Sequence, residues 1–85
     1  MIVHIVTVLD ENFNPKVQRI FPTKEFALSY ATILTKVLED YLNAKSEDVL
    51  EQVKKEMPEE AKNTELIYVR TIAEKFAVAV METET

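Results

Sequence analysis

Eighty-five residues form one small domain, residues 1–85, because a chain of this length buries only about 60–65% of its unfolded surface and cannot support two cores. The chain is 47% hydrophobic and 29% charged, which excludes a disordered or fibrous protein. Its 10 basic and 15 acidic residues leave a net charge of −5, which opposes direct binding to nucleic acid or to an anionic membrane surface.

Two residue types are absent from the chain, and each absence excludes particular kinds of functional site. The chain has no cysteine, so disulfides, thiolate catalysis and cysteine zinc sites are excluded. It has no glycine, which excludes the glycine-rich loops that hold phosphates. Turns with positive φ must then use residues that tolerate that region, and the candidates are Asn12, Asn14, Asn43 and Asn63.

The first elements predicted are two strands joined by a turn. Residues Ile2 to Leu9 are β-branched or apolar on both faces, which is typical of an interior strand. Lys16 to Phe21 alternates between polar and apolar side chains. The segment DENFNP lies between them, and its Asn and Pro residues predict a hairpin.

DENFNP also begins like a calcium-binding loop of the EF-hand type, with Asp10, Asn12 and Asn14 at alternate positions. The later positions depart from that pattern. The sixth is Pro15 where the loop needs glycine, and the twelfth is Phe21 where it needs glutamate. We therefore expect a turn and no metal.

Two helices are predicted next. Thr23 is a suitable N-cap for a long helix from Lys24 to Leu42, in which apolar residues recur at helical spacing along a wide face. The residues from Asn43 to Lys45 predict its end. Ser46 is interpreted as the N-cap of a second, shorter helix, which should end near Glu56 because Pro58 follows.

The chain then predicts a second hairpin, with strands from Glu65 to Ile72 and from Lys75 to Glu82. The expected fold is α+β, a four-stranded antiparallel sheet in ββααββ order with two helices packed on one face. With both helices on one face, the other face of the sheet is left without cover. We therefore expect an exposed sheet face that could form a homodimer, with Tyr68 as its marker.

No catalytic constellation is present in the sequence. His4 is the only histidine, and the only serines are Ser29 and Ser46. None of them belongs to a motif that pairs a nucleophile with a base. We expect a protein that is not an enzyme and needs no cofactor or metal.

Acidic residues are concentrated in one part of the chain. Nine acids and four bases lie between Glu39 and Glu65, so this segment accounts for the whole net charge. Such a cluster has two interpretations, a solubilising surface or a face that docks on a basic protein surface. For the second interpretation the expected contact residues are Glu47, Asp48, Glu51, Glu59 and Glu60.

A very short, acidic, glycine-free and cysteine-free α+β domain is similar in general character to the small accessory proteins of phages and other mobile elements. The sequence therefore favours a cytoplasmic protein that binds a partner with a basic surface. It would act as an inhibitor of a host defence or nucleic-acid-processing protein. The alternative is a homodimeric structural or regulatory module that associates through its exposed sheet face.

Overall fold

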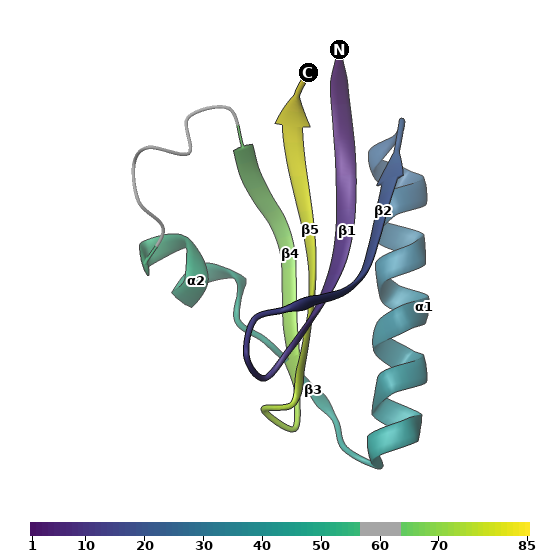
Figure 1. Cartoon of the computed structure of the whole chain (residues 1–85), viewed down its shortest axis with the longest axis vertical. Helices are drawn as coiled ribbons and strands as arrows, with labels where there is room; N and C mark the ends of the chain where they lie inside the picture. The colour runs from purple at the N-terminus through teal and green to yellow at the C-terminus, as the bar shows by residue number, and fades with distance from the viewer. Residues whose placement is uncertain (57–63) are drawn as a thin grey trace.

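The computed structural model describes residues 1–56 and 64–85. In these residues the elements are β1 (Ile2–Asp10), β2 (Pro15–Phe21), α1 (Lys24–Leu42), β3 (Ser46–Asp48), α2 (Leu50–Glu56), β4 (Thr64–Ile72) and β5 (Phe76–Glu84). The strands form one antiparallel sheet of five strands in the order β2-β1-β5-β4-β3 (Figure 1). The α+β class is confirmed. The predicted four-stranded ββααββ arrangement is wrong, because the short strand β3 lies between the two helices and extends the sheet.

The centre of the sheet joins the first and last strands of the chain. β1 and β5 pair from Ile2 opposite Glu84 to Asp10 opposite Phe76, and Figure 1 shows the two termini side by side. The backbone N–H of Thr85 donates to the carbonyl of Met1 at 2.8 Å. The prediction that the first strand is interior is confirmed, because β1 has β2 on one side and β5 on the other.

Both ends of α1 are set by local caps, as predicted. The hydroxyl of Thr23 accepts a hydrogen bond from the backbone N–H of Phe26 at 3.4 Å. Asn43 ends the helix in the left-handed region at φ 52°, and its N–H donates to the carbonyl of Glu39.

Among the described residues, no helix is both long and apolar enough to cross a membrane.

The two helices lie on opposite sides of the sheet (Figure 1). On the α1 face, Ala27 and Ala31 pack against a cluster of buried sheet residues, namely Val6, Val8, Ile72, Val78 and Val80. On the other face, called the α2 face, Leu66, Val69 and Ala79 form a smaller cluster, against which α2 and the residue before it pack Val49, Leu50 and Val53. The prediction that both helices pack on one face is therefore wrong.

Three side chains hold β3 at the edge of the sheet, and we call them the Glu39–Ser46–Arg70 clamp. The Glu39 carboxylate accepts hydrogen bonds from the backbone N–H of Ser46 at 2.7 Å and from its hydroxyl at 2.9 Å. Arg70 donates to the Ser46 hydroxyl at 2.8 Å and to its carbonyl at 3.1 Å. The hydrogen bonds from Ser46 lower the pKa of Glu39. The clamp ties α1, β3 and β4 together through one small residue.

Ser46 is therefore not the N-cap of the second helix, as the sequence suggested. It lies in β3 opposite Ile72. The side chain of Asp48 takes the capping role instead, because its carboxylate accepts a hydrogen bond from the backbone N–H of Leu50 at 3.0 Å. As a result, α2 begins only at Leu50, after the chain has passed the edge of the sheet.

The clamp predicts a pH-dependent contribution to stability. The folded state lowers the pKa of Glu39. The contribution of the Glu39 carboxylate to folding stability is therefore complete above the pKa that Glu39 has in the unfolded chain, and it is lost as pH falls through the lower pKa that Glu39 has in the folded chain. We expect Glu39→Gln to lower the midpoint of thermal unfolding at pH 7, and we expect this deficit to shrink below about pH 4. Circular dichroism melts from pH 7 to pH 3 would measure it.

Asp40→Asn is the matched control, because Asp40 is the next residue of α1 and forms an exposed ion pair with Lys36 at 3.3 Å. Exposed pairs of this kind contribute little. A deficit for Glu39→Gln that is equally large at pH 3 and pH 7 would show that the carboxylate charge does not hold β3.

Candidate protein-binding groove

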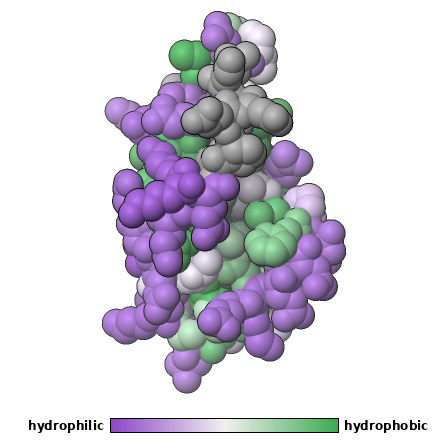
Figure 2. Space-filling view, turned by 90° about the vertical axis from the view of Figure 1, so that its left-hand side faces the viewer, coloured by the Kyte–Doolittle hydropathy of each residue, from purple (hydrophilic) through white to green (hydrophobic). Residues whose placement is uncertain are grey.

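An open groove of about 430 Å³ runs across the α2 face. Val49 and Val53 form one wall, and Phe13 of the β1–β2 turn and Pro15 at the start of β2 form the other. The floor consists of sheet side chains, chiefly Leu9, Leu66, Val69, Ala77, Ala79 and Met81. Figure 2 shows hydrophobic side chains exposed on this side of the molecule between hydrophilic ones.

The groove exists because α2 is short and two of the floor residues are alanines. α2 has seven residues, and its contacts with the sheet are to β4. Ala77 and Ala79 of β5 leave space that longer side chains would fill. Toward the β2 edge, Ile20 is 65% exposed. The half of this face that β1 and β2 provide is therefore without helical cover in the described residues.

Asp10 shapes the turn that forms the second wall. Its carboxylate accepts hydrogen bonds from the backbone N–H groups of Asn12 at 2.8 Å and Asn14 at 2.9 Å. It also lies 3.5 Å from the ammonium of Lys16. The hydrogen bond from Asn14 is the largest of the effects that lower the pKa of Asp10. The predicted hairpin is confirmed, and this carboxylate is occupied by the backbone of the turn.

Phe13 is the unusual residue of this turn. It has φ 63°, a left-handed conformation in which a bulky side chain is unfavourable. Its side chain lines the groove and is 80% exposed. The prediction that Asn12 or Asn14 would take this conformation is wrong, although the corresponding prediction for Asn43 is confirmed. Asn63 lies outside the described residues.

The structure describes three of the five acids predicted to contact a partner. Glu47 is exposed and pairs in the sheet with Thr71, which lines the groove. Glu51 is exposed in the first turn of α2. Asp48 is exposed as well, but its carboxylate is the cap of α2. Glu59 and Glu60 lie outside the described residues.

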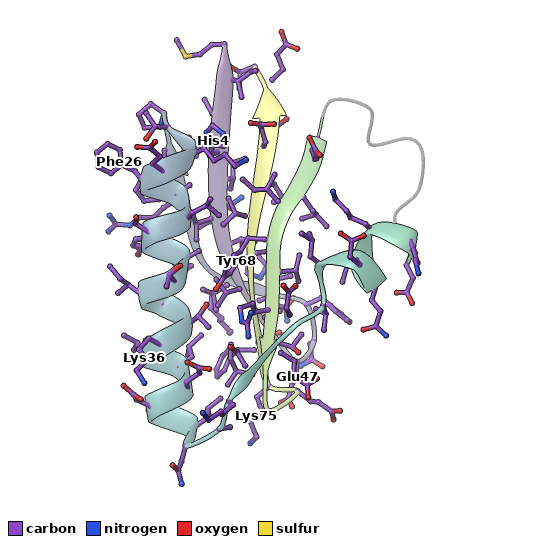
Figure 3. All side chains as sticks on the ribbon, turned by 180° about the vertical axis from the view of Figure 1, so that it is seen from behind. His4, Phe26, Lys36, Glu47, Tyr68 and Lys75 are labelled. Carbon is purple, nitrogen blue, oxygen red and sulfur yellow. The ribbon has the colours of Figure 1, made fainter. Side chains whose placement is uncertain are left out.

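Tyr68, the predicted marker of a dimer face, lies on the α1 face of the sheet. Its hydroxyl is 2.8 Å from that of Thr35 of α1, and its ring packs against the larger core cluster. Figure 3 shows Tyr68 between α1 and the sheet. Ile20, a sheet residue that is 65% exposed, pairs with Ile5 and lies on the opposite face from Tyr68.

Several other polar side chains of the described residues are paired within the chain, although the Nδ1 of His4 is buried without a hydrogen-bond partner. His4 is buried, and its Nε2 is 3.0 Å from the Glu82 carboxylate. A second, polar hollow lies between α1 and the β3–β4 edge, but it is lined by the clamp and by the Thr35–Tyr68 pair. The described ranges contain no group of three residues suited to hold a metal ion. The groove is thus the surface best suited to bind a ligand.

Comparison with known proteins identifies a viral relative of this chain. No protein-family model matches the chain, and no solved structure matches it. "Uncharacterized protein 70" of Sulfolobus islandicus filamentous virus (isolate Iceland/Hveragerdi) is 38% identical over 81 residues, which are 95% of this chain and 98% of the viral protein. This relative supports the viral association that composition suggested. With identity at this level along almost the whole of both sequences, the chain belongs to the same family as this viral protein.

Proposed function

We propose that this protein is a non-enzymatic binding protein whose groove on the α2 face holds an apolar, basic-flanked segment of another protein. Phe13 carries the proposal. An aromatic residue in the left-handed region costs about 1–2 kcal/mol, and the 80% exposed ring of Phe13 regains little of this within the chain. A partner that covers the ring would contribute about 1.5–3 kcal/mol. The residue is therefore better suited to binding than to folding.

The groove supplies the apolar part of the binding surface. Its walls and floor present aliphatic side chains from β1, α2, β4 and β5, so a bound segment would bury its own apolar side chains against several elements at once. Apolar anchors in a pocket carry most of the affinity of such interfaces. We expect the partner to contribute one or two large apolar residues.

Two acids supply the charged part. Glu47 pairs with Thr71, which lines the groove, and Glu51 is exposed in the first turn of α2, the helix that carries the wall residue Val53. Neither takes part in an ion pair among the described residues. Acids in this position would steer a basic partner and select against an acidic one, with a smaller effect on affinity itself.

A family with a viral member supports a host protein as the partner. If the groove and its acids bind a basic surface that the host protein needs for its activity, this protein would inhibit that activity. Glu59 and Glu60 lie outside the described residues, and the proposal does not depend on them.

A second copy of the chain is the alternative occupant of this face. Ile20 favours it, because an aliphatic side chain that is 65% exposed on a sheet face is a suitable contact for self-association. In this case the protein would be a homodimeric regulatory or structural module.

The strain at Phe13 predicts that stability can be gained at this position. Phe13→Asn places a residue that tolerates the left-handed region there. We expect the free energy of unfolding to rise by about 0.5–1 kcal/mol, measured by urea denaturation at pH 7. Ile2→Thr is the control, because it removes an exposed apolar side chain from a strand, where no such strain exists. A loss of stability in Phe13→Asn would mean that the ring is needed for folding.

The same variant tests binding. Random peptides displayed on phage would be selected on the immobilised protein, and the enriched peptides should combine large apolar residues with Lys or Arg. We expect Phe13→Asn to weaken their binding about tenfold or more, while Ile2→Thr leaves it unchanged. Fluorescence anisotropy with the labelled peptides gives the Kd. Equal Kd values for Phe13→Asn and the unchanged protein would overturn the proposal.

Charge reversal tests the role of the acids separately. The double variant Glu47→Lys, Glu51→Lys should weaken the binding of the selected peptides mainly at low salt, because salt near 1 M screens the charges. Glu25→Lys with Glu84→Lys makes the same change of net charge away from the groove and is the control. If both pairs weaken binding equally, only the overall charge matters. Self-association that Phe13→Asn abolishes would favour the homodimer instead.

A further inference from the structure

A second apolar surface lies on α1, on the side that the sheet does not cover. Phe26, Ile33, Val37 and Tyr41 are 65%, 63%, 55% and 79% exposed, and we call these four residues the α1 stripe. Their spacing of seven, four and four residues places them along one line on a helix. Figure 3 shows Phe26 pointing away from the sheet.

The contacts of neighbouring residues show on which side of α1 this stripe lies. Thr35 and Glu39 reach β4 and β3 through Tyr68 and Ser46. Tyr30, which belongs to the same side of the helix as the stripe, packs instead against Phe21 of β2, with the ring centroids 5.2 Å apart. The stripe therefore lies above the β2 edge of the sheet, where the described residues provide no further helix.

The order of residues in the stripe is complementary to itself. Its ends are aromatic, Phe26 and Tyr41, and its middle is aliphatic, Ile33 and Val37. When two such helices pack antiparallel about a two-fold axis near Ile33, Phe26 of each copy meets Tyr41 of the other. The aliphatic residues then meet at the centre, as an isologous interface requires.

The exposed area is of the size that a weak dimer needs. The four side chains expose roughly 450 Å² in each chain, given the usual areas of such residues. Two copies would therefore bury about 900 Å² from the stripe alone, and the flanking side chains bring the interface near the lower limit of about 1,200 Å² for specific complexes.

We propose that the α1 stripe binds the same stripe of a second copy, which forms a two-fold dimer through an antiparallel pair of α1 helices. This interface is separate from the groove, so both can be occupied in one assembly. A dimer would present two grooves on its outer sides and would bind a repetitive or dimeric partner with avidity. The inference does not rest on the function proposed above.

The mass in solution tests the dimer. Light scattering of the full chain from about 1 µM to about 1 mM should show an increase from 9.8 kDa toward twice that mass. Ile33→Lys should weaken association at least tenfold without changing the unfolding midpoint of the dilute, monomeric chain. Thr32→Lys, about 100° around the helix from Ile33, should not weaken it. A chain that stays monomeric at about 1 mM overturns the proposal. So does an association that Phe13→Asn abolishes and Ile33→Lys does not.

The absence of cysteine makes a second measurement specific. Ile33→Cys should form a disulfide-linked dimer on mild oxidation, because the two-fold axis brings the two side chains together. A mixture of Phe26→Cys and Tyr41→Cys chains should cross-link more than either chain alone. Thr32→Cys, on another side of the helix, is the control. Equal cross-linking of Thr32→Cys and Ile33→Cys would contradict the antiparallel helix pair.

Discussion

The Glu39–Ser46–Arg70 clamp decides on which side of the sheet the middle of the chain continues. Its hydrogen bonds to Ser46 are charge-assisted and therefore stronger than those between neutral groups. They hold a strand of only three residues against β4. Because the chain runs along the sheet edge there, α2 begins beyond that edge and packs on the face opposite α1.

The groove follows from that arrangement. α1, with 19 residues, covers one face of the sheet, while α2, with seven, covers only part of the other. The second core is correspondingly small, with Leu66, Val69 and Ala79 as its buried members. A small core of this kind contributes less to stability than the α1 side. The open remainder of the face is the surface on which the chain can bind another molecule.

Local signals in the sequence predict most of the elements, and long-range contacts explain what they miss. Thr23 and Asn43 mark the ends of α1 because caps depend on a few neighbouring residues. β3 cannot be recognised in this way, since three polar residues show no periodicity and their pairing depends on Arg70, 24 residues further along. The groove could not be predicted for the same reason. The face on which α2 packs is a property of the folded sheet.

The conformation of Phe13 could not be predicted from the sequence for another reason, because a phenylalanine rarely adopts the left-handed backbone conformation that it has here. Backbone preferences favour the flanking asparagines for the left-handed conformation. In the structure the Asp10 carboxylate instead accepts hydrogen bonds from the backbone N–H groups of both asparagines, and Phe13 between them takes the left-handed conformation. Residues that break a local rule in this way are often those that serve function.

The pairing of β1 with β5 at the centre of the sheet also has a consequence for how the chain folds. Local hairpins can form early, but the two strands that join them are the most distant in sequence, from Ile2 to Glu84. Closing so long a loop carries an entropic penalty before any contact compensates it, and such topologies fold in roughly milliseconds to seconds. During synthesis the first hairpin must wait for the last strand, so its inner edge stays open to the surrounding solution until β5 emerges, even though α1 is already available to cover one of its faces.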